Sequence, residues 1–225
     1  MSLLLGLALA VERGPGTWEI GANPAGQGQG WASVGLTQIG VPGRTGYMLL
    51  PGGELFYAPT DTLAVQVRAQ VGPVFADDGP YPLAFGTIGA RWMLVDRPGL
   101  KLAPTLGSLG VRGFGDGPIG GAALGVALQT GAGRWHLDLS WPMLGFAFLD
   151  DFPLFVPPWA GLLVTEVGLT LDVGPHSIRV GTTAWFPMVT LRVRPDGRFF
   201  MDVSVGGAPE FGPTAGLQAG FTFGD

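Results

Sequence analysis

Hydrophobic and polar residues alternate along segments that lie far apart in the chain. Between residues 62 and 71, aliphatic residues occupy one face of an extended chain, while Gln66, Arg68 and Gln70 occupy the other. Residues 134–143 and 214–223 follow the same rule. A period of two residues is typical of a β-strand whose two faces meet different surroundings. The pattern therefore predicts an all-β protein.

Weaker copies of this alternation fill the space between these segments and predict about twelve strands. By residue number, the expected strands are 27–39, 53–58, 62–75, 83–95, 100–112, 120–130, 134–144, 160–172, 177–184, 188–194, 198–205 and 214–223. Ten strands are the alternative if residues 54–58 prove irregular. The alternation slips within 100–112, which predicts a β-bulge around Gly107 to Gly110.

The expected connections between strands alternate in length. Turn-like links lie at 96–99, 130–133, 173–176 and 195–197, and longer links at 42–52, 76–82, 113–119, 145–159 and 206–213. The link near residues 185–188 is short where a longer one is due. Short turns at one end and longer loops at the other are typical of outer-membrane barrels. We therefore expect an up-and-down antiparallel transmembrane β-barrel.

Two hairpin-like segments and the last strand resemble bacterial outer-membrane β-barrel proteins. These are residues 54–68, 89–104 and 216–223, the last resembling the C-terminal strand of such proteins, which ends on an aromatic residue. Here Gly224 and Asp225 follow that aromatic residue. The resemblance implies one barrel domain over 27–225 in the outer membrane of a Gram-negative bacterium, with the lipid bilayer as its partner. It implies no specific activity.

Composition excludes several other classes of protein. The chain has 225 residues, of which 47% are hydrophobic, only 13% are charged and 40 are glycine. Soluble domains carry about 25% charged residues, and disordered chains lack this much apolar surface. No stretch approaches the about 20 consecutive apolar residues of a membrane-spanning helix. A net charge of −5 argues against nucleic acid as a partner.

The N-terminal segment has two interpretations. Residues 1–10 are apolar and end in Ala8-Leu9-Ala10, which has the small-x-small pattern of a signal-peptidase site. The positively charged start of a signal peptide is missing. Residues 1–26 are therefore either a truncated signal peptide with a lead-in to the barrel, or a frayed apolar N-terminus.

Energetic cost predicts which face of each strand meets lipid. An Arg or Lys facing lipid at mid-membrane costs about 2 to 4 kcal/mol, so basic residues on the polar face should point into the lumen. Eight are expected there, against the four acids Asp138, Glu166, Asp172 and Asp202. The lumen-lining residues that we predict are Gln66, Arg68, Gln70, Arg91, Lys101, Arg112, Arg134, His136, Asp138, Glu166, Arg179, Arg192, Arg194 and Asp202.

This excess of basic residues would attract small anionic solutes. The leading interpretation is a passive narrow channel that favours anions, or a closed structural barrel in which paired charges fill the lumen. One alternative is an outer-membrane enzyme that modifies lipid or lipopolysaccharide. A second alternative is a soluble lipocalin-like barrel that binds a ligand in an apolar interior.

Catalytic and metal-binding signals are weak. His136, Asp138 and Ser140 share one face of a strand, but residues four apart lie about 13 Å from each other, too far for a catalytic triad. Outer-membrane phospholipases, which resemble this chain in barrel size, carry a His-x-Ser motif on the lipid-facing side, whereas here Asp138 is two residues after His136. We therefore expect no enzyme. Two histidines without clustered carboxylates predict no metal site or cofactor.

An aromatic-rich segment, residues 146–159, stands where a polar loop would be expected. It could fold into the barrel mouth, bind a partner or dip into the outer leaflet. The favoured interpretation is an extension of the strand and of an aromatic girdle at the membrane interface. Six tryptophans are candidates for such girdles: Trp18, Trp92, Trp135, Trp141, Trp159 and Trp185.

Overall fold

In a computed structural model of the chain, the described residues form β-strands joined by turns. The structure describes residues 27–40, 46–76, 79–112, 119–149, 152–157, 165–183, 186–195, 198–208 and 212–224. The strands are β1 Gly30–Gly40, β2 Tyr47–Tyr57, β3 Leu63–Ala76, β4 Gly79–Trp92, β5 Val95–Arg97, β6 Leu100–Arg112, β7 Ile119–Ala132, β8 Trp135–Leu149, β9 Phe152–Val156, β10 Glu166–Val173, β11 His176–Thr183, β12 Phe186–Val193, β13 Phe199–Ala208 and β14 Gly212–Phe223.

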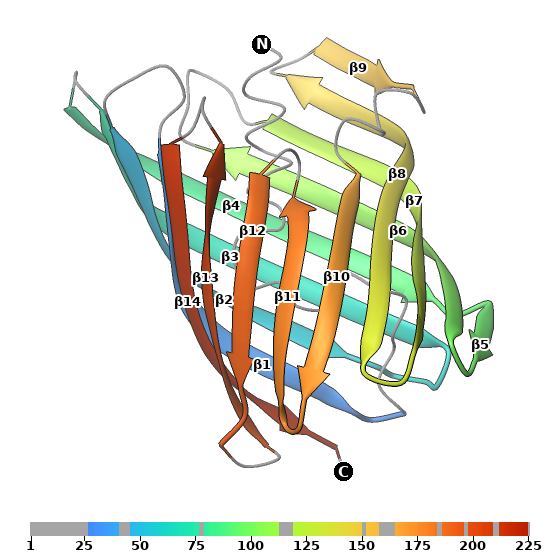
Figure 1. The fold of residues 1–225 in the computed structure, drawn as a ribbon. Coiled ribbons are helices and arrows are strands. Elements are labelled where there is room, and N and C mark those ends of the chain that lie inside the picture. Colours follow the sequence, from blue (N-terminus) through green and yellow to red (C-terminus); the bar gives the residue numbers. More distant parts are fainter. Residues whose placement is uncertain are drawn as a thin grey trace.

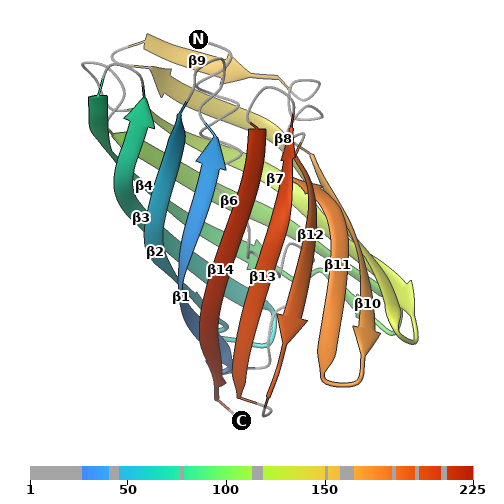
Figure 2. The same cartoon turned by 60° about the vertical axis from the view of Figure 1, so that its left-hand side comes forward.

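Twelve of these strands close into an antiparallel barrel (Figures 1 and 2). Each strand pairs with the next along the chain, apart from the short additions β5 and β9, which pair with β6 and β8. The barrel closes where β1 pairs with β14 and where β8 pairs with β10. The expected fold and strand number are confirmed, and the ten-strand alternative is wrong because β2 pairs with β1 along its whole length.

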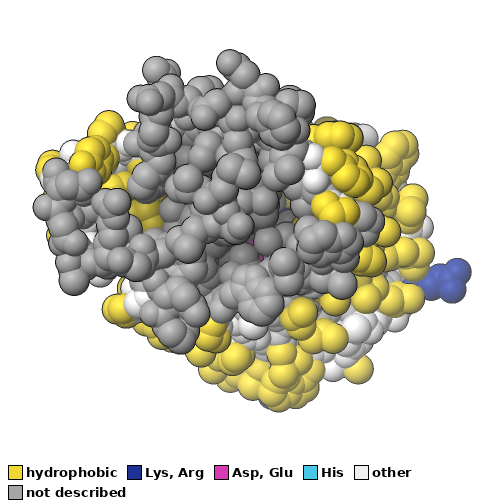
Figure 3. All heavy atoms as spheres, turned by 90° about the horizontal axis from the view of Figure 1, so that it is seen from above, with side chains coloured by type: hydrophobic (Ala, Val, Ile, Leu, Met, Phe, Trp, Pro, Cys, Tyr) yellow, Lys and Arg dark blue, Asp and Glu magenta, His cyan; other side chains and the backbone are white. Residues whose placement is uncertain are grey.

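Outward-facing side chains are mostly aliphatic. The large aliphatic residues that stay exposed on the outer face include Val34, Leu36, Leu55, Val67, Val71, Ile88, Leu106, Leu124, Leu137, Leu169, Val180, Val189, Leu191, Val203 and Leu217. Seen from above, hydrophobic side chains line much of the visible outer rim of the barrel (Figure 3). Within the described part, no helix is long and apolar enough to cross a membrane.

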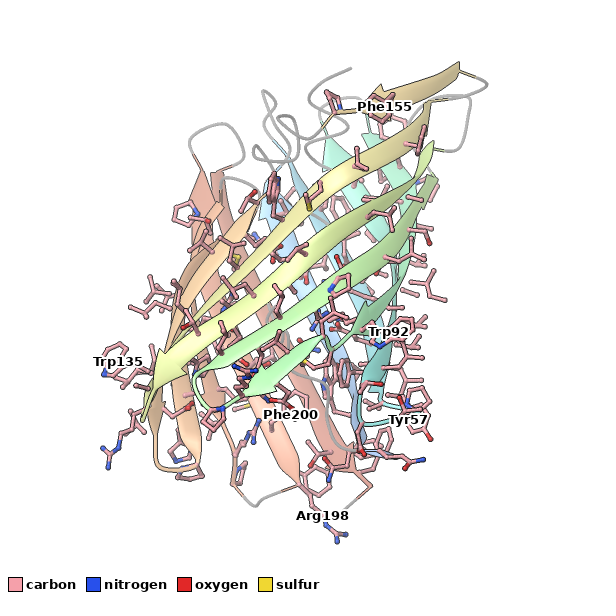
Figure 4. All side chains as sticks on the ribbon, turned by 90° about the vertical axis from the view of Figure 1, so that its right-hand side faces the viewer. Tyr57, Trp92, Trp135, Phe155, Arg198 and Phe200 are labelled. Atoms are coloured by element: carbon pink, nitrogen blue, oxygen red, sulfur yellow. The ribbon has the colours of Figure 1, made fainter. Side chains whose placement is uncertain are left out.

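Aromatic side chains mark the two ends of this apolar exterior. At the end that carries the tight turns, which we call the turn end, the outward aromatic residues include Tyr57, Trp92 and Trp135 (Figure 4). At the opposite end, the loop end, the ring of Tyr47 lies 4.9 Å from that of Phe75. Aromatic girdles of this kind are typical of transmembrane barrels. The expectation for Trp141 is wrong, because it lies half-buried in the middle of β8; Trp18, Trp159 and Trp185 lie outside the described residues.

The exposed charged residues of the outer surface lie near the turn end. Two-residue turns there contain Gly133 and Gly174 at φ 64° and 62°, a conformation that favours glycine and suits the twist of a hairpin. The exposed charged residues that the structure describes at this end are Asp61, Arg97, Arg134 and Arg198, whereas Asp96 shares the inward face of Lys101 and forms an ion pair with it. A charge at this level can reach the water beyond the membrane.

Loop lengths differ from the expected alternation. Because β3 extends to Ala76 and β4 begins at Gly79, the link expected at 76–82 has only two residues. The link expected at 206–213 is also short, because β13 reaches Ala208 and β14 begins at Gly212. Similarly, β2 begins at Tyr47, inside the loop expected at 42–52. The residues that were expected in loops instead extend the strands and pair across them. Their Pro and Gly residues had indicated turns.

The expected bulge at Gly107 to Gly110 is wrong. The strand β6 pairs with β4 and β7 in unbroken register through these residues. The irregularity lies instead between β7 and β8, at Leu124 and Gly125. The unbroken register places Arg112 opposite Ala84, in line with the outward residue Ile88 and not on the inner face.

The aromatic segment extends the barrel wall, as the favoured interpretation predicted. The strand β8 continues to Leu149 and pairs with β9, so that residues 145–149 face 156–152. The rings of Phe146 and Phe155 pack at 5.5 Å across this hairpin. Residues 1–26, with the expected signal peptide or lead-in, lie outside the described residues.

Candidate functional site

The inner face of the barrel carries a belt of buried polar side chains at mid-height. Strand alternation places them opposite the exposed aliphatic residues of the same strands. The members with little exposure are Ser33, Thr37, Glu54, Arg68, Gln70, Asp138, Ser140, Glu166, Thr170, Ser177, Arg179, Thr190, Arg192, Asp202, Ser204, Thr214 and Gln218. A buried polar group lowers the stability of the fold unless it is hydrogen-bonded. The hydrogen-bond partners of these side chains therefore show which of them are satisfied within the wall and which could interact with a solute.

Glu54 is the centre of one hydrogen-bond network. It accepts hydrogen bonds from Gln66 and Gln218, and it stands opposite Arg68 in the register of β2 and β3. Gln66 in turn accepts a hydrogen bond from Arg91 Nη2 at 3.1 Å. This network links β14, β2, β3 and β4 across the inner wall. Glu54 was not among the predicted lumen residues, because the expected strand 53–58 is too short to show a clear alternation, whereas β2 spans Tyr47–Tyr57.

Arg192 and Asp202 form a buried ion pair on neighbouring strands. Arg192 Nε and Nη2 donate to the two carboxylate oxygens of Asp202 at 2.7 and 2.8 Å. The side chains are only 2% and 0% exposed, and the guanidinium lies 4.4 Å from the ring centroid of Phe200. Two parallel hydrogen bonds of this kind fix the guanidinium in one orientation. Both residues face inward, as predicted.

A third polar cluster joins β8, β10 and β11. His136 Nε2 lies 3.9 Å from Asp138 Oδ2, and His136 Nδ1 lies 3.8 Å from Asp172 Oδ2. The guanidinium of Arg179 lies against Gly168 on the neighbouring strand, where any Cβ would collide with it. Arg179 also attracts Asp138 electrostatically. Glycine at position 168 therefore provides room for an inward arginine.

This cluster does not assemble a catalytic triad from the residues weighed in the sequence. His136 stands opposite Thr170, whereas Ser140 stands opposite Glu166, four residue pairs further along β8. His136 is therefore placed between two aspartates and not beside the serine hydroxyl. Within the described part of the chain, no group of three or more His, Asp or Glu side chains is arranged to hold a metal ion.

Apolar side chains fill part of the lumen at the turn end. Trp31 stacks on Phe56 with ring centroids 5.8 Å apart, and Phe200 meets Trp31 edge-on at 6.0 Å. Ala58 and Ala64 complete this cluster, whose members are at most 4% exposed. Figure 4 shows Phe200 inside the barrel, in contrast to the outward Trp135. Alternation along the strands does not predict these inward rings, because a period of two separates the two faces without showing which large apolar residues face inward.

Most of the predicted lumen residues lie on the inner face. Those that the strands direct inward are Gln66, Arg68, Gln70, Arg91, Lys101, His136, Asp138, Glu166, Arg179, Arg192 and Asp202. Arg194 follows the end of β12, half-buried, and its backbone N–H donates to His176 Nδ1 at 3.3 Å.

Two of the predicted lumen residues are corrected. Arg134 is exposed in the turn between β7 and β8, because the strand it was expected to begin starts one residue later, at Trp135. Arg112 falls on the outward register for the reason given above. With Glu54 and Asp96 added, the inward charges of the described residues are balanced. The bases are Arg68, Arg91, Lys101, Arg179, Arg192 and Arg194, and the acids are Glu54, Asp96, Asp138, Glu166, Asp172 and Asp202.

No protein-family model matches the chain, and no curated protein matches it in sequence. Among solved structures, an outer membrane channel from Pseudomonas putida F1 is similar with a TM-score of 0.60, over 92% of this chain and 98% of that chain, at 13% identity. The chain has the fold of a bacterial outer-membrane β-barrel. The resemblance inferred from the hairpins and the last strand is thereby confirmed.

Two further solved structures are similar at lower scores. The translocator domain of the autotransporter NalP from Neisseria meningitidis matches with a TM-score of 0.48 at 12% identity, over 100% of this chain and 96% of that chain. Outer membrane phospholipase A from Escherichia coli matches with a TM-score of 0.45 at 7% identity, over 88% and 97%. Neither score carries an inference about this chain. The barrel fold and its apolar exterior agree with the expected location in a Gram-negative outer membrane.

The apolar exterior has a direct experimental consequence. We expect the purified barrel to stay folded in detergent micelles or vesicles and to aggregate when the amphiphile is removed, because the outer aliphatic residues would then meet water. On a gel, unboiled protein should migrate differently from boiled protein. A barrel that remains dispersed and folded without amphiphile would contradict the membrane assignment and favour the lipocalin-like alternative.

Proposed function

We propose that the protein is a narrow passive channel for small polar solutes, with a weak preference for anions. The inner wall supports this proposal, because its polar side chains could replace part of the hydration of a solute that crosses the membrane. The dense packing of the polar belt supports a narrow passage in place of a wide pore. A closed structural barrel is the alternative.

The observation that carries the anion preference is the division of inward charges by exposure. The deeply buried charged residues include both signs and form networks with each other, as Arg192 does with Asp202. The inward charges that are not deeply buried are the bases Arg91, Lys101 and Arg194 and the acids Asp172 and Asp96, of which Asp96 forms an ion pair with Lys101 at 3.6 Å. A solute in water experiences the half-buried charges most strongly, since buried pairs are compensated by their partners. This excess of basic residues is smaller than the sequence predicted, and so is the selectivity that we propose.

Conductance in planar bilayers tests this proposal. We expect small discrete steps for the wild-type protein and, in a salt gradient, a reversal potential that favours anions. Arg91→Gln should move the permeability ratio toward equal passage of anions and cations, because it removes a half-buried positive charge from the inner wall. Arg198→Gln is the matched control, since Arg198 is exposed outside the strands at the turn end.

The outcomes separate the alternatives. Folded protein without conductance would support the closed structural barrel and reject the channel. Conductance whose ion preference is the same in Arg91→Gln and in the wild-type protein would reject the proposed source of selectivity.

A further inference from the structure

The two sides of the inner wall differ in how much of their polar surface remains accessible. On β11, β12, β13, β14, β1 and β2, the inward side chains at mid-height are buried, with Thr190, Arg192, Ser204, Gln218 and Glu54 as examples. On β4, β6 and β7, the inward residues Thr87, Arg91, Thr105 and Gln129 are only half-buried. We call the first side the packed wall and the second side the accessible wall.

Residue size accounts for part of this difference. The inward positions of β6 and β7 above Lys101 and Gln129 are Ala103, Thr105, Gly107, Ala123, Gly125 and Ala127. The packed wall instead carries bulky inward groups such as Trp31, Arg192 and Phe200. Small residues leave open cross-section around Thr105 and Gly107, which are half-buried, whereas Ala103 and Ala127 are covered in a cluster with Met93.

This wall also contains a buried acceptor without a partner, as the packed wall contains such atoms at Trp31 and Thr214. Gln129 faces Asp138 on β8, and the two side chains interact by a hydrogen bond. Among the described residues, Asp138 Oδ1 has no hydrogen-bond partner although the side chain is 2% exposed. A buried carboxylate oxygen requires a donor, which water or a solute with an N–H or O–H group can supply.

The accessible wall also continues toward the turn end. There the side chains of His136 and Asp172 keep 25% and 44% of their surface, and Lys101 keeps 29%. At the same level the other side is filled by the aromatic cluster of Trp31, Phe56 and Phe200. Half-buried polar groups therefore lie on this side of the barrel both at Thr105 and toward the turn end, on either side of a buried apolar cluster of Met93, Ala103 and Ala127.

We propose that solutes cross the barrel along β4, β6 and β7 and past His136 at the start of β8, where they meet Thr105, Arg91, Gln129 and His136. The opposite wall acts as a solid polar core that holds the barrel in shape and does not contact the solute. This inference rests on the proposed channel function and specifies which residues determine its selectivity.

The chain contains no cysteine, so single cysteines report accessibility without interference. Thr105→Cys and Gln129→Cys probe the accessible wall, while Thr190→Cys and Ser204→Cys are matched controls on the packed wall. The probe is sulfonatoethyl methanethiosulfonate, a small anionic thiol reagent, applied to folded protein in vesicles and followed by mass spectrometry. We expect the first pair to react at least about tenfold faster than the second, because thiol modification follows exposure.

Conductance of the same variants provides a second measurement. Modification of Thr105→Cys should reduce the current, whereas treatment of Thr190→Cys should leave it unchanged. Gel mobility before and after boiling verifies that each variant is folded, and Thr105→Cys and Ser204→Cys are the most conservative changes.

The two proposals can fail separately. Fast labelling of the accessible wall in a protein that conducts no current would reject the channel function. The difference in accessibility between the two walls would still stand. Equal labelling of both walls, or faster labelling at Thr190→Cys, in a protein that conducts would overturn the route and retain the channel.

Discussion

Asp202→Ala should destabilise the barrel more than any other single change that we predict. The substitution leaves the guanidinium of Arg192 buried without the two oxygens of Asp202 that accept its hydrogen bonds. The loss of one partner of a buried ion pair costs about 3 to 5 kcal/mol. We expect the free energy of unfolding in vesicles, measured by tryptophan fluorescence in urea, to fall by that amount. The same variant should lose its heat-resistant mobility on a gel at a lower temperature.

A double variant serves as the control for this prediction. Replacing both partners, as in Arg192→Leu with Asp202→Leu, removes the charge and its counter-charge together and should cost much less than Asp202→Ala. If Asp202→Ala and the double variant unfold at the same urea concentration, an unpaired buried Arg192 carries no extra cost and the prediction is wrong. Thr190→Val with Ser204→Val tests the adjacent hydrogen bond of 2.8 Å in the same way, with a smaller expected loss.

Val203→Arg should destabilise the inserted barrel by about 2 to 4 kcal/mol, the cost of a basic residue at the lipid-facing midplane. Val203 points outward near the middle of β13, in a row with Leu191 and Leu217 on the neighbouring strands. These three side chains are 40 to 52% exposed, as expected for a lipid contact. Unfolding in vesicles of defined thickness measures the effect.

Phe199→Arg is the matched control on the same face of the same strand. Phe199 begins β13 at the turn end, beside the exposed Arg198, so a new arginine there can extend into water and should cost about 1 kcal/mol or less. Equal losses for Val203→Arg and Phe199→Arg would contradict a bilayer centred on the middle of β13. Little loss for either would mean that this face does not meet lipid.

The strands were predictable because their chemistry is local. In β3, apolar outward residues such as Val67 alternate with polar inward residues such as Arg68. The sequence alone therefore indicates both the strand and its two faces. The same holds for Asp202 and Val203 in β13. Strand ends were less predictable: Pro51 and Gly52 indicate a turn, yet they lie inside β2, where pairing with β1 supplies their hydrogen bonds.

The errors at the candidate site have a common origin. Arg134 continues the alternating pattern of β8 but lies in the turn before that strand. The sequence pattern does not show where hydrogen-bonded pairing ends, so it extends one residue beyond the strand. Arg112 was misplaced because a shift of one residue in register reverses the face of each side chain, and Glu54 was omitted because most of β2 was expected to be a loop. Trp31, Phe56 and Phe200 are inward although they are apolar, and only the closed barrel brings them together.

The amino-acid sequence by itself determined that this chain forms a membrane barrel of about twelve strands with charged residues inside, because alternation and the cost of charge in lipid act within each strand. The tertiary structure decided which charges are paired, which wall is packed and where water can reach. Those properties depend on contacts between strands far apart in the chain, and they follow only when the register is fixed and the barrel is closed.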